Sequence, residues 1–196
     1  MESQRTSTDG ETRLLAATRE SVILHGVRRT TANDIAERAG ISRMTFYRRA
    51  GSVENAVLAT LTEEFRAATD TLRASGPDGT GRERLVHFAA ASVRVFATSP
   101  LLASIAERDP EFLIPYVTDR FGASQQLVLE ELNTRLDAGV HDGSISAREG
   151  TATLVLLALQ GVAISSRVLL KNHAFDDALD ELGIMLDSYL APGSIS

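Results

Sequence analysis

The chain has 196 residues, of which 43% are hydrophobic and 23% are charged, the balance of a globular protein long enough to bury a core. It contains no cysteine, which excludes disulfides and thiolate metal sites, and it has no apolar run of the roughly 18 residues that a membrane span needs. Its first ten residues are polar and lack the apolar centre of a signal peptide, so we expect a cytoplasmic protein.

The net charge of −6 is distributed unevenly along the chain. The first 52 residues hold nine arginines against six acids, whereas the remaining residues hold eleven basic residues against twenty acids. Such an asymmetry predicts a basic surface, suited to nucleic acid, on an otherwise acidic body.

Helical periodicity dominates the sequence, and no alternating strand pattern stands out. Residues 1–10 are expected to form a flexible arm. Thr31 and Asp34 are spaced as a capping box, and Gly26 and Gly40 are placed to end helices. We therefore predict an all-α protein of about nine helices. The predicted helices cover residues 11–26, 31–40, 42–50, 52–73, 82–99, 101–108, 124–138, 147–170 and 176–190, and Pro100, Pro110 and Pro115 interrupt the middle of the chain.

Residues 31–50, TANDIAERAGISRMTFYRRA, have the pattern of a helix-turn-helix. In this motif a first helix braces a second helix, which lies in the major groove of DNA. Gly40 can make the tight turn, and small or apolar residues such as Ala36 and Ile41 let the two helices cross closely. A helix buried in the core would not need the polar and basic residues that come after Gly40 in this segment. The residues expected to contact DNA are Thr31, Asn33, Ser42, Arg43, Met44, Thr45, Tyr47, Arg48 and Arg49.

Different roles are expected within this set. Arg43 is suited to bidentate hydrogen bonding with guanine, worth about 1–3 kcal/mol of discrimination, and Met44 to contact with a thymine methyl group. Asn33 is close enough to the start of its helix to contact a base or a sugar, while Thr31 has a second interpretation as a helix cap alone. Phosphate contacts are expected from Thr45, Tyr47, Arg48 and Arg49.

The segment RLLAATRESVILHGVRRTTANDIAERAGISRMTFYRRAGSVENAV resembles the N-terminal domain of TetR-family (tetracycline-repressor-like) transcriptional regulators. The resemblance covers roughly residues 11–60. The family has a first helix ending in Gly, a second helix opened by Thr with Ile-Ala inside it, an Ala-Gly-Ile/Val-Ser turn and an aromatic residue late in the recognition helix. The matching positions here are Gly26, Thr31, Ile35, Ala36, Ala39, Gly40, Ile41, Ser42 and Tyr47.

Four positions depart from the family pattern. Arg49 and Ala50 stand where the family usually has His-Phe, and Met44 stands where it often has Gly. Val53 stands where a Lys commonly contacts phosphate. The absence of Lys at position 53 puts one contact with the DNA backbone in question, and Arg49 is a candidate to replace it.

The resemblance implies a helix-turn-helix DNA-binding domain at residues 11–51, followed at 52–196 by a linking helix and an effector-binding and dimerisation domain. The implied function is that of a homodimeric, sequence-specific transcriptional regulator, a repressor that a small-molecule effector releases from a palindromic operator. An alternative stays open: an all-α small-molecule-binding protein or enzyme with a vestigial helix-turn-helix, which the acidic net charge and the missing Lys favour. We expect no enzymatic activity, because the sequence has no phosphate loop or nucleophile elbow, and no metal site or cofactor, because its four histidines are isolated.

Two further surfaces are expected in the C-terminal part. The effector pocket is predicted at His87, Phe88, Arg94, Phe96, Phe112, Tyr116 and Phe121, although each of these could equally be ordinary core or surface. The resemblance implies that the last two helical patterns pair with their copies in a homodimer, although their apolar stripes must also pack in part on their own domain. The residues assigned to this interface are Leu154, Leu157, Ala158, Gly161, Ser165, Val168, Leu179, Leu182 and Leu186.

Overall fold

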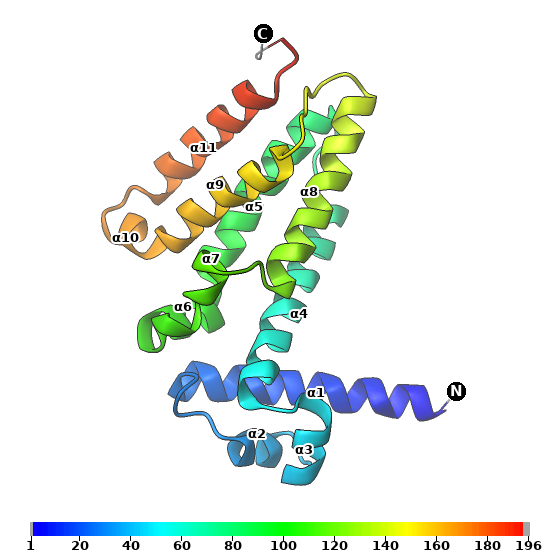
Figure 1. Ribbon diagram of the computed structural model, residues 1–196, viewed down its shortest axis with the longest axis vertical. Coiled ribbons are helices and arrows are strands. Elements are labelled where there is room, and N and C mark those ends of the chain that lie inside the picture. The colour runs from blue at the N-terminus through cyan, green and yellow to red at the C-terminus, as the bar shows by residue number, and fades with distance from the viewer. Residues whose placement is uncertain (1, 194–196) are drawn as a thin grey trace. The chain divides into compact units, whose positions relative to one another are not determined.

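The computed structural model describes residues 2–193, with side chains from residue 9 onward, and this part of the chain is helical without strands. It contains eleven α-helices and one 3-10 helix, where about nine helices were predicted (Figure 1). The elements are α1 Glu2–His25, α2 Ala32–Arg38, α3 Arg43–Ala50, α4 Val53–Ala74, α5 Gly81–Thr98, α6 Pro100–Arg108, η1 Pro110–Phe112, α7 Pro115–Thr118, α8 Ala123–His141, α9 Thr151–Ile164, α10 Ser166–Lys171 and α11 Phe175–Leu190.

The higher count has local causes. Residues 147–170 were predicted as one helix, but the helix starts only after Gly150, whose φ of 86° is left-handed, and it breaks at Ser165. Neighbouring serines have low helix propensity, which makes such a break inexpensive. In the middle of the chain, Pro110 and Pro115 each occupy the first turn of a short helix, where a missing N–H costs nothing.

The first helix is longer than expected. Residues 1–10 were predicted as a flexible arm, but α1 already begins at Glu2, and Met1 lies outside the described residues. One contact supports the continuation: Arg13 lies 3.3 Å from the Asp9 carboxylate, one helical turn away, which joins the predicted arm to the predicted helix.

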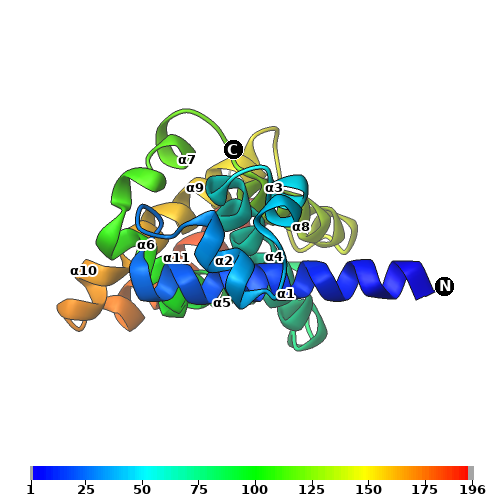
Figure 2. The ribbon, with the colours of Figure 1, turned by 90° about the horizontal axis from the view of Figure 1, so that it is seen from below.

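The helices form two compact units. The first contains residues 1–64 and 99–123, and the second contains residues 65–98 and 124–196. The sequence placed a single domain boundary after residue 51, but α6, η1 and α7 join the N-terminal helices instead. Within the first unit, α2 and α3 lie beside α1 (Figures 1 and 2). One core cluster of this unit consists of Leu14, Ala17, Ala32, Ile35, Ala36, Ala39, Phe46 and Ala56.

The second unit is built around three mutually packed helices, α5, α9 and α11 (Figure 1). Its core is larger and takes one apolar side from each of these helices and from α8. A largely buried ion pair lies on α8, where the Arg135 guanidinium contacts the buried Glu131 carboxylate at 2.8 Å and covers the ring of Phe88 at 4.3 Å. Desolvation by burial lowers the pKa of Arg135 from its ordinary value.

Within residues 2–193, no single helix is long and apolar enough to cross a membrane. Only α5 and α6, taken together as a pair, reach the required length and composition.

Candidate nucleic-acid interface

The turn between α2 and α3 follows the local chemistry of its residues. Gly40 has a left-handed φ of 65°, which glycine adopts without strain. Ser42 caps α3, since its Oγ accepts a hydrogen bond from the Thr45 amide at 3.1 Å, and the two hydroxyls lie 2.9 Å apart. These two hydroxyl groups are therefore engaged in starting α3.

The start of α2 is a complete capping box, as predicted. The Asp34 amide donates to the Thr31 hydroxyl at 3.2 Å, and the Thr31 amide donates back to the Asp34 carboxylate at 3.1 Å. The hydrogen bond from the Thr31 side chain, followed by that from its backbone, lowers the pKa of Asp34. Asn33 lies exposed beside this cap. The cap interpretation of Thr31 is thus confirmed, while its contact with DNA stays a prediction.

One side of α3 is anchored in the core and another is exposed. Phe46 is fully buried, and its ring and that of Tyr47 form a T-shaped pair with a centroid distance of 5.4 Å. Arg43 lies 5.6 Å over the Tyr47 ring, and Met44 leaves 80% of its surface in solvent. With the exposed Arg48, these side chains make a surface that we call the α3 reading face: Arg43, Met44, Tyr47 and Arg48. This surface combines positive charge, an aromatic hydroxyl group and an apolar side chain. Such groups are suited to contact base edges in the major groove and the phosphate backbone of DNA.

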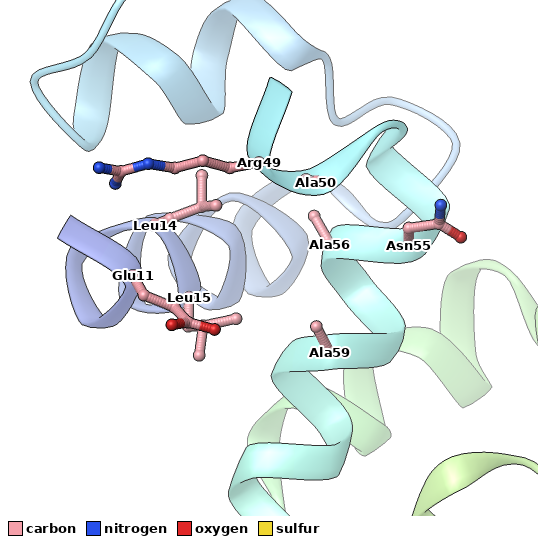
Figure 3. Close-up of a pocket in the computed structure, with 8 residues that line it drawn as sticks. All are labelled: Glu11, Leu14, Leu15, Arg49, Ala50, Asn55, Ala56 and Ala59. Atoms are coloured by element: carbon pink, nitrogen blue, oxygen red, sulfur yellow. The ribbon is translucent and has the colours of Figure 1, made fainter. Parts of the chain in front are cut away.

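Arg49 does not belong to the α3 reading face. Its side chain is exposed, as that of Arg48 is, but it extends toward α1 (Figure 3). Its guanidinium lies over α1 at Gly10, where an added Cβ would come within 2.3 Å of it. The expectation that Arg49 replaces the family's missing lysine as a phosphate contact is therefore not supported by its position.

A cavity of about 390 Å³ opens beside Arg49, between α1, α3 and the start of α4 (Figure 3). Its walls combine apolar side chains with one acid, one base and one amide. The lining residues are Glu11, Leu14, Leu15, Arg49, Ala50, Asn55, Ala56 and Ala59. Sequence reasoning did not identify this cavity, because its lining residues come from three separate segments of the chain.

Comparison with known proteins decides the identity of this fold. The family model described as "Bacterial regulatory proteins, tetR family" matches residues 14–58, the segment that builds the α3 reading face. An HTH-type transcriptional regulator of Mycobacterium tuberculosis is 34% identical over 194 residues, covering 97% of this chain and 98% of that protein, and one of Mycobacterium bovis matches equally well. The chain belongs to the TetR family of bacterial regulatory proteins. As a member of this family, it is a DNA-binding transcriptional regulator.

Solved structures of TetR-family proteins share the fold along nearly the whole chain. A TetR-family regulator of Pectobacterium atrosepticum superposes with a TM-score of 0.72 at 20% identity, covering 94% of this chain and 96% of that one. The transcriptional repressor QsdR of R. erythropolis gives a TM-score of 0.65 at 18% identity, with 90% and 94% covered. At these identities the likeness concerns the fold alone.

The residues predicted for the effector pocket of this TetR-family chain fall in both compact units. Phe112, Tyr116 and Phe121 belong to the first unit. In the second unit, Phe88 is fully buried beneath Arg135 and belongs to the core, and its assignment as pocket lining stays a prediction. The remaining members are the exposed His87, the half-buried Phe96 and Arg94, which is exposed and paired with Asp176 at 2.8 Å.

The predicted dimer face separates into two groups. Leu154, Leu157, Gly161, Ser165 and Val168 are exposed on α9 and at its junction with α10, as a partner would require, and Ala158 is half-buried. Their contact with a partner stays a prediction.

The residues assigned to this face on α11 need correction. Leu179, Leu182 and Leu186 are buried in the core of their own unit, because a leucine stripe at helical spacing first covers the nearest apolar helices, α5 and α9. The apolar surface that α11 leaves exposed is instead Ile184, at 60%, and Met185, at 50%. These two residues lie outside the leucine stripe, which is why the sequence pattern did not draw attention to them.

Proposed function

We propose that the protein is a homodimeric repressor that reads a palindromic operator through its α3 reading face and leaves it when a small molecule binds. One observation supports the DNA-binding part above all others. The α3 helix buries Phe46 completely and presents Arg43, Met44, Tyr47 and Arg48 to solvent. The buried side fixes the helix, so that the exposed side meets DNA in a single orientation.

The proposed dimer rests on the apolar residues that α9, α10 and α11 leave exposed. These three helices contact one another, and each carries large apolar side chains that its own unit does not cover. Extended apolar surface of this kind is uncommon on a monomeric protein and marks interaction sites. The residues are Leu154, Leu157, Ile164, Val168, Leu170, Ile184 and Met185. Twofold pairing through them would place two copies of α3 on inverted half-sites of DNA.

The proposed release from DNA requires that effector binding and DNA binding favour two different conformations of the protein. A small molecule can lower operator affinity only if it binds the released conformation more tightly than the DNA-bound one. Coupling of about 1–3 kcal/mol corresponds to about 5- to 150-fold weaker binding to the operator. Phe96 beside Phe65, at a centroid distance of 6.0 Å, and the exposed His87 are the residues of the second unit that we assign to the effector.

The test is selection of DNA sequences from a random library by the full-length protein. The proposal predicts enrichment of two inverted half-sites separated by a fixed number of base pairs. Recovery of a single half-site without a repeat would refute the proposal that the protein binds DNA as a twofold dimer. Enrichment no greater than that of a control without protein would refute sequence-specific DNA binding. It would favour a small-molecule-binding protein with a vestigial helix-turn-helix.

A further inference from the structure

A buried carboxylate on the segment after α6 holds the turn that leads into the helix-turn-helix. The side chain of Asp109, at the junction of α6 and η1, is 7% exposed. One of its oxygens accepts a hydrogen bond from the Val27 amide at 2.6 Å, and the other accepts one from the Arg28 amide at 3.4 Å. These amides belong to the turn after α1, and 82 residues separate Val27 from Asp109 in sequence. A distant acid thus accepts hydrogen bonds from two consecutive backbone amides of this turn.

The same segment also satisfies the carbonyl groups at the end of α1. Ser104, on α6, donates its hydroxyl hydrogen to the Val22 carbonyl at 2.8 Å, and Arg108, one turn later, donates to the Leu24 carbonyl. Arg28 returns a side-chain contact, because its guanidinium reaches both Asp109, at 3.7 Å, and Glu111. Side chains of α6 and η1 therefore supply donors to the last turn of α1 and acceptors to the residues after it.

The turn is shaped to receive this carboxylate. Gly26 has a left-handed φ of 79°, and a Cβ added to it would come within 2.5 Å of Asp109 Oδ2. Two independent requirements, backbone conformation and space for the acid, therefore exclude a side chain at Gly26. Glycine is common at helix ends for its backbone conformation, and here the close approach of the carboxylate adds a second requirement.

Helix α2 depends on this turn for its position. With only seven residues it is too short to be stable without tertiary contacts. Its capping residue, Thr31, follows directly on the turn, and α2 in turn packs on α3. We propose that Asp109 is a positioning residue for DNA binding: by holding the Val27 and Arg28 amides, it fixes the start of α2 and, through α2, the α3 reading face.

The test compares variants of the full-length protein in two measurements. The first is binding to the selected operator, with Arg43→Ala as the reference for loss of DNA reading. The second is residue-resolved amide hydrogen exchange by NMR, which does not depend on DNA. Asp109→Ala removes both acceptors, whereas the isosteric Asp109→Asn keeps one acceptor oxygen. Glu107→Gln changes the charge equally at an exposed position of α6 and serves as the matched control.

The proposal predicts graded effects. Asp109→Ala should weaken operator binding about tenfold or more, because two buried donors lose their partner, and Asp109→Asn should lie between it and wild type. Glu107→Gln should bind as wild type does. The Val27 amide should exchange faster in Asp109→Ala, while amides of α9 in the second unit keep their protection.

Two results would overturn the proposal. Unchanged exchange of the Val27 amide in Asp109→Ala would show that the acid does not hold the turn. Faster exchange there with undiminished operator affinity would show that DNA binding does not need the held turn. If Asp109→Ala unfolds, so that α9 also loses protection, the same two criteria apply to Asp109→Asn and the Arg28 amide. The DNA readout rests on the proposed function: failure of wild type to bind any selected DNA would refute that function, and the exchange measurement would still decide whether Asp109 holds the turn.

Discussion

Adjacent arginines at the end of α3 should differ sharply in their effect on DNA binding. Arg48 is exposed on the α3 reading face, whereas the Arg49 guanidinium lies over α1 at Gly10. Neutralising one phosphate changes the slope of log affinity against log salt concentration by about 0.9 on double-stranded DNA. Because the proposed twofold dimer carries two copies of Arg48, Arg48→Ala should make this slope shallower by about 1.8. Arg49→Ala should leave it unchanged.

The assay is fluorescence anisotropy with a labelled operator, titrated at salt concentrations between about 50 and 200 mM. Arg49→Ala serves as the matched control for Arg48→Ala, because each variant removes one arginine from the same turn of the same helix. Equal reductions of the slope in both variants would refute the reasoning, since they would place both guanidinium groups on phosphates. A reduction in Arg49→Ala alone would reverse the assignment of the two sides of α3.

Three other changes test separate parts of the account. Ile184→Asp should yield monomers in sedimentation velocity, because it places a charge on the exposed apolar surface of α11, and a persisting dimer would contradict that interface. Phe46→Ala should lower the free energy of unfolding in urea by about 3–5 kcal/mol, and a loss below about 1 kcal/mol would contradict a tightly packed base for α3. Hydrogen bonds from Ser144, and then from the Gly81 amide, lower the pKa of Asp142, so its contribution to stability is present above its unfolded-state pKa and is lost as pH falls through the folded pKa. Urea unfolding of Asp142→Asn should therefore show a smaller loss of stability on acidification than wild type, and equal losses would contradict this.

Local chemistry made the helix-turn-helix predictable. Capping boxes and left-handed glycines depend on residues within four positions of one another, and the structure has both where the sequence indicated them, at Thr31 with Asp34 and at Gly40. The start of α3 at Ser42 follows the same rule. Family membership then adds what these few hydrogen bonds do not specify, namely that the motif binds DNA.

The errors arose where a residue's side of a helix or a distant contact decides its role. Arg49 is adjacent to Arg48 in sequence and is also exposed, but its guanidinium lies over α1 at Gly10, a contact that the sequence does not indicate. The leucine stripe of α11 was assigned to a partner, although the nearest apolar surface belongs to its own unit. Asp109 gave no sequence signal at all, because its partners at Val27 and Arg28 come together with it only in the fold.

The most direct test of the account is binding of the wild-type protein and Arg43→Ala to the DNA beside the protein's own gene, with scrambled DNA of equal length as the competitor. Arg120→Ala, which removes an exposed arginine outside the helix-turn-helix, is the control for charge. Wild type and Arg120→Ala are expected to prefer the natural DNA, and Arg43→Ala should lose about 1–3 kcal/mol of this preference per half-site. An undiminished preference in Arg43→Ala would contradict the assignment of base reading to the α3 reading face.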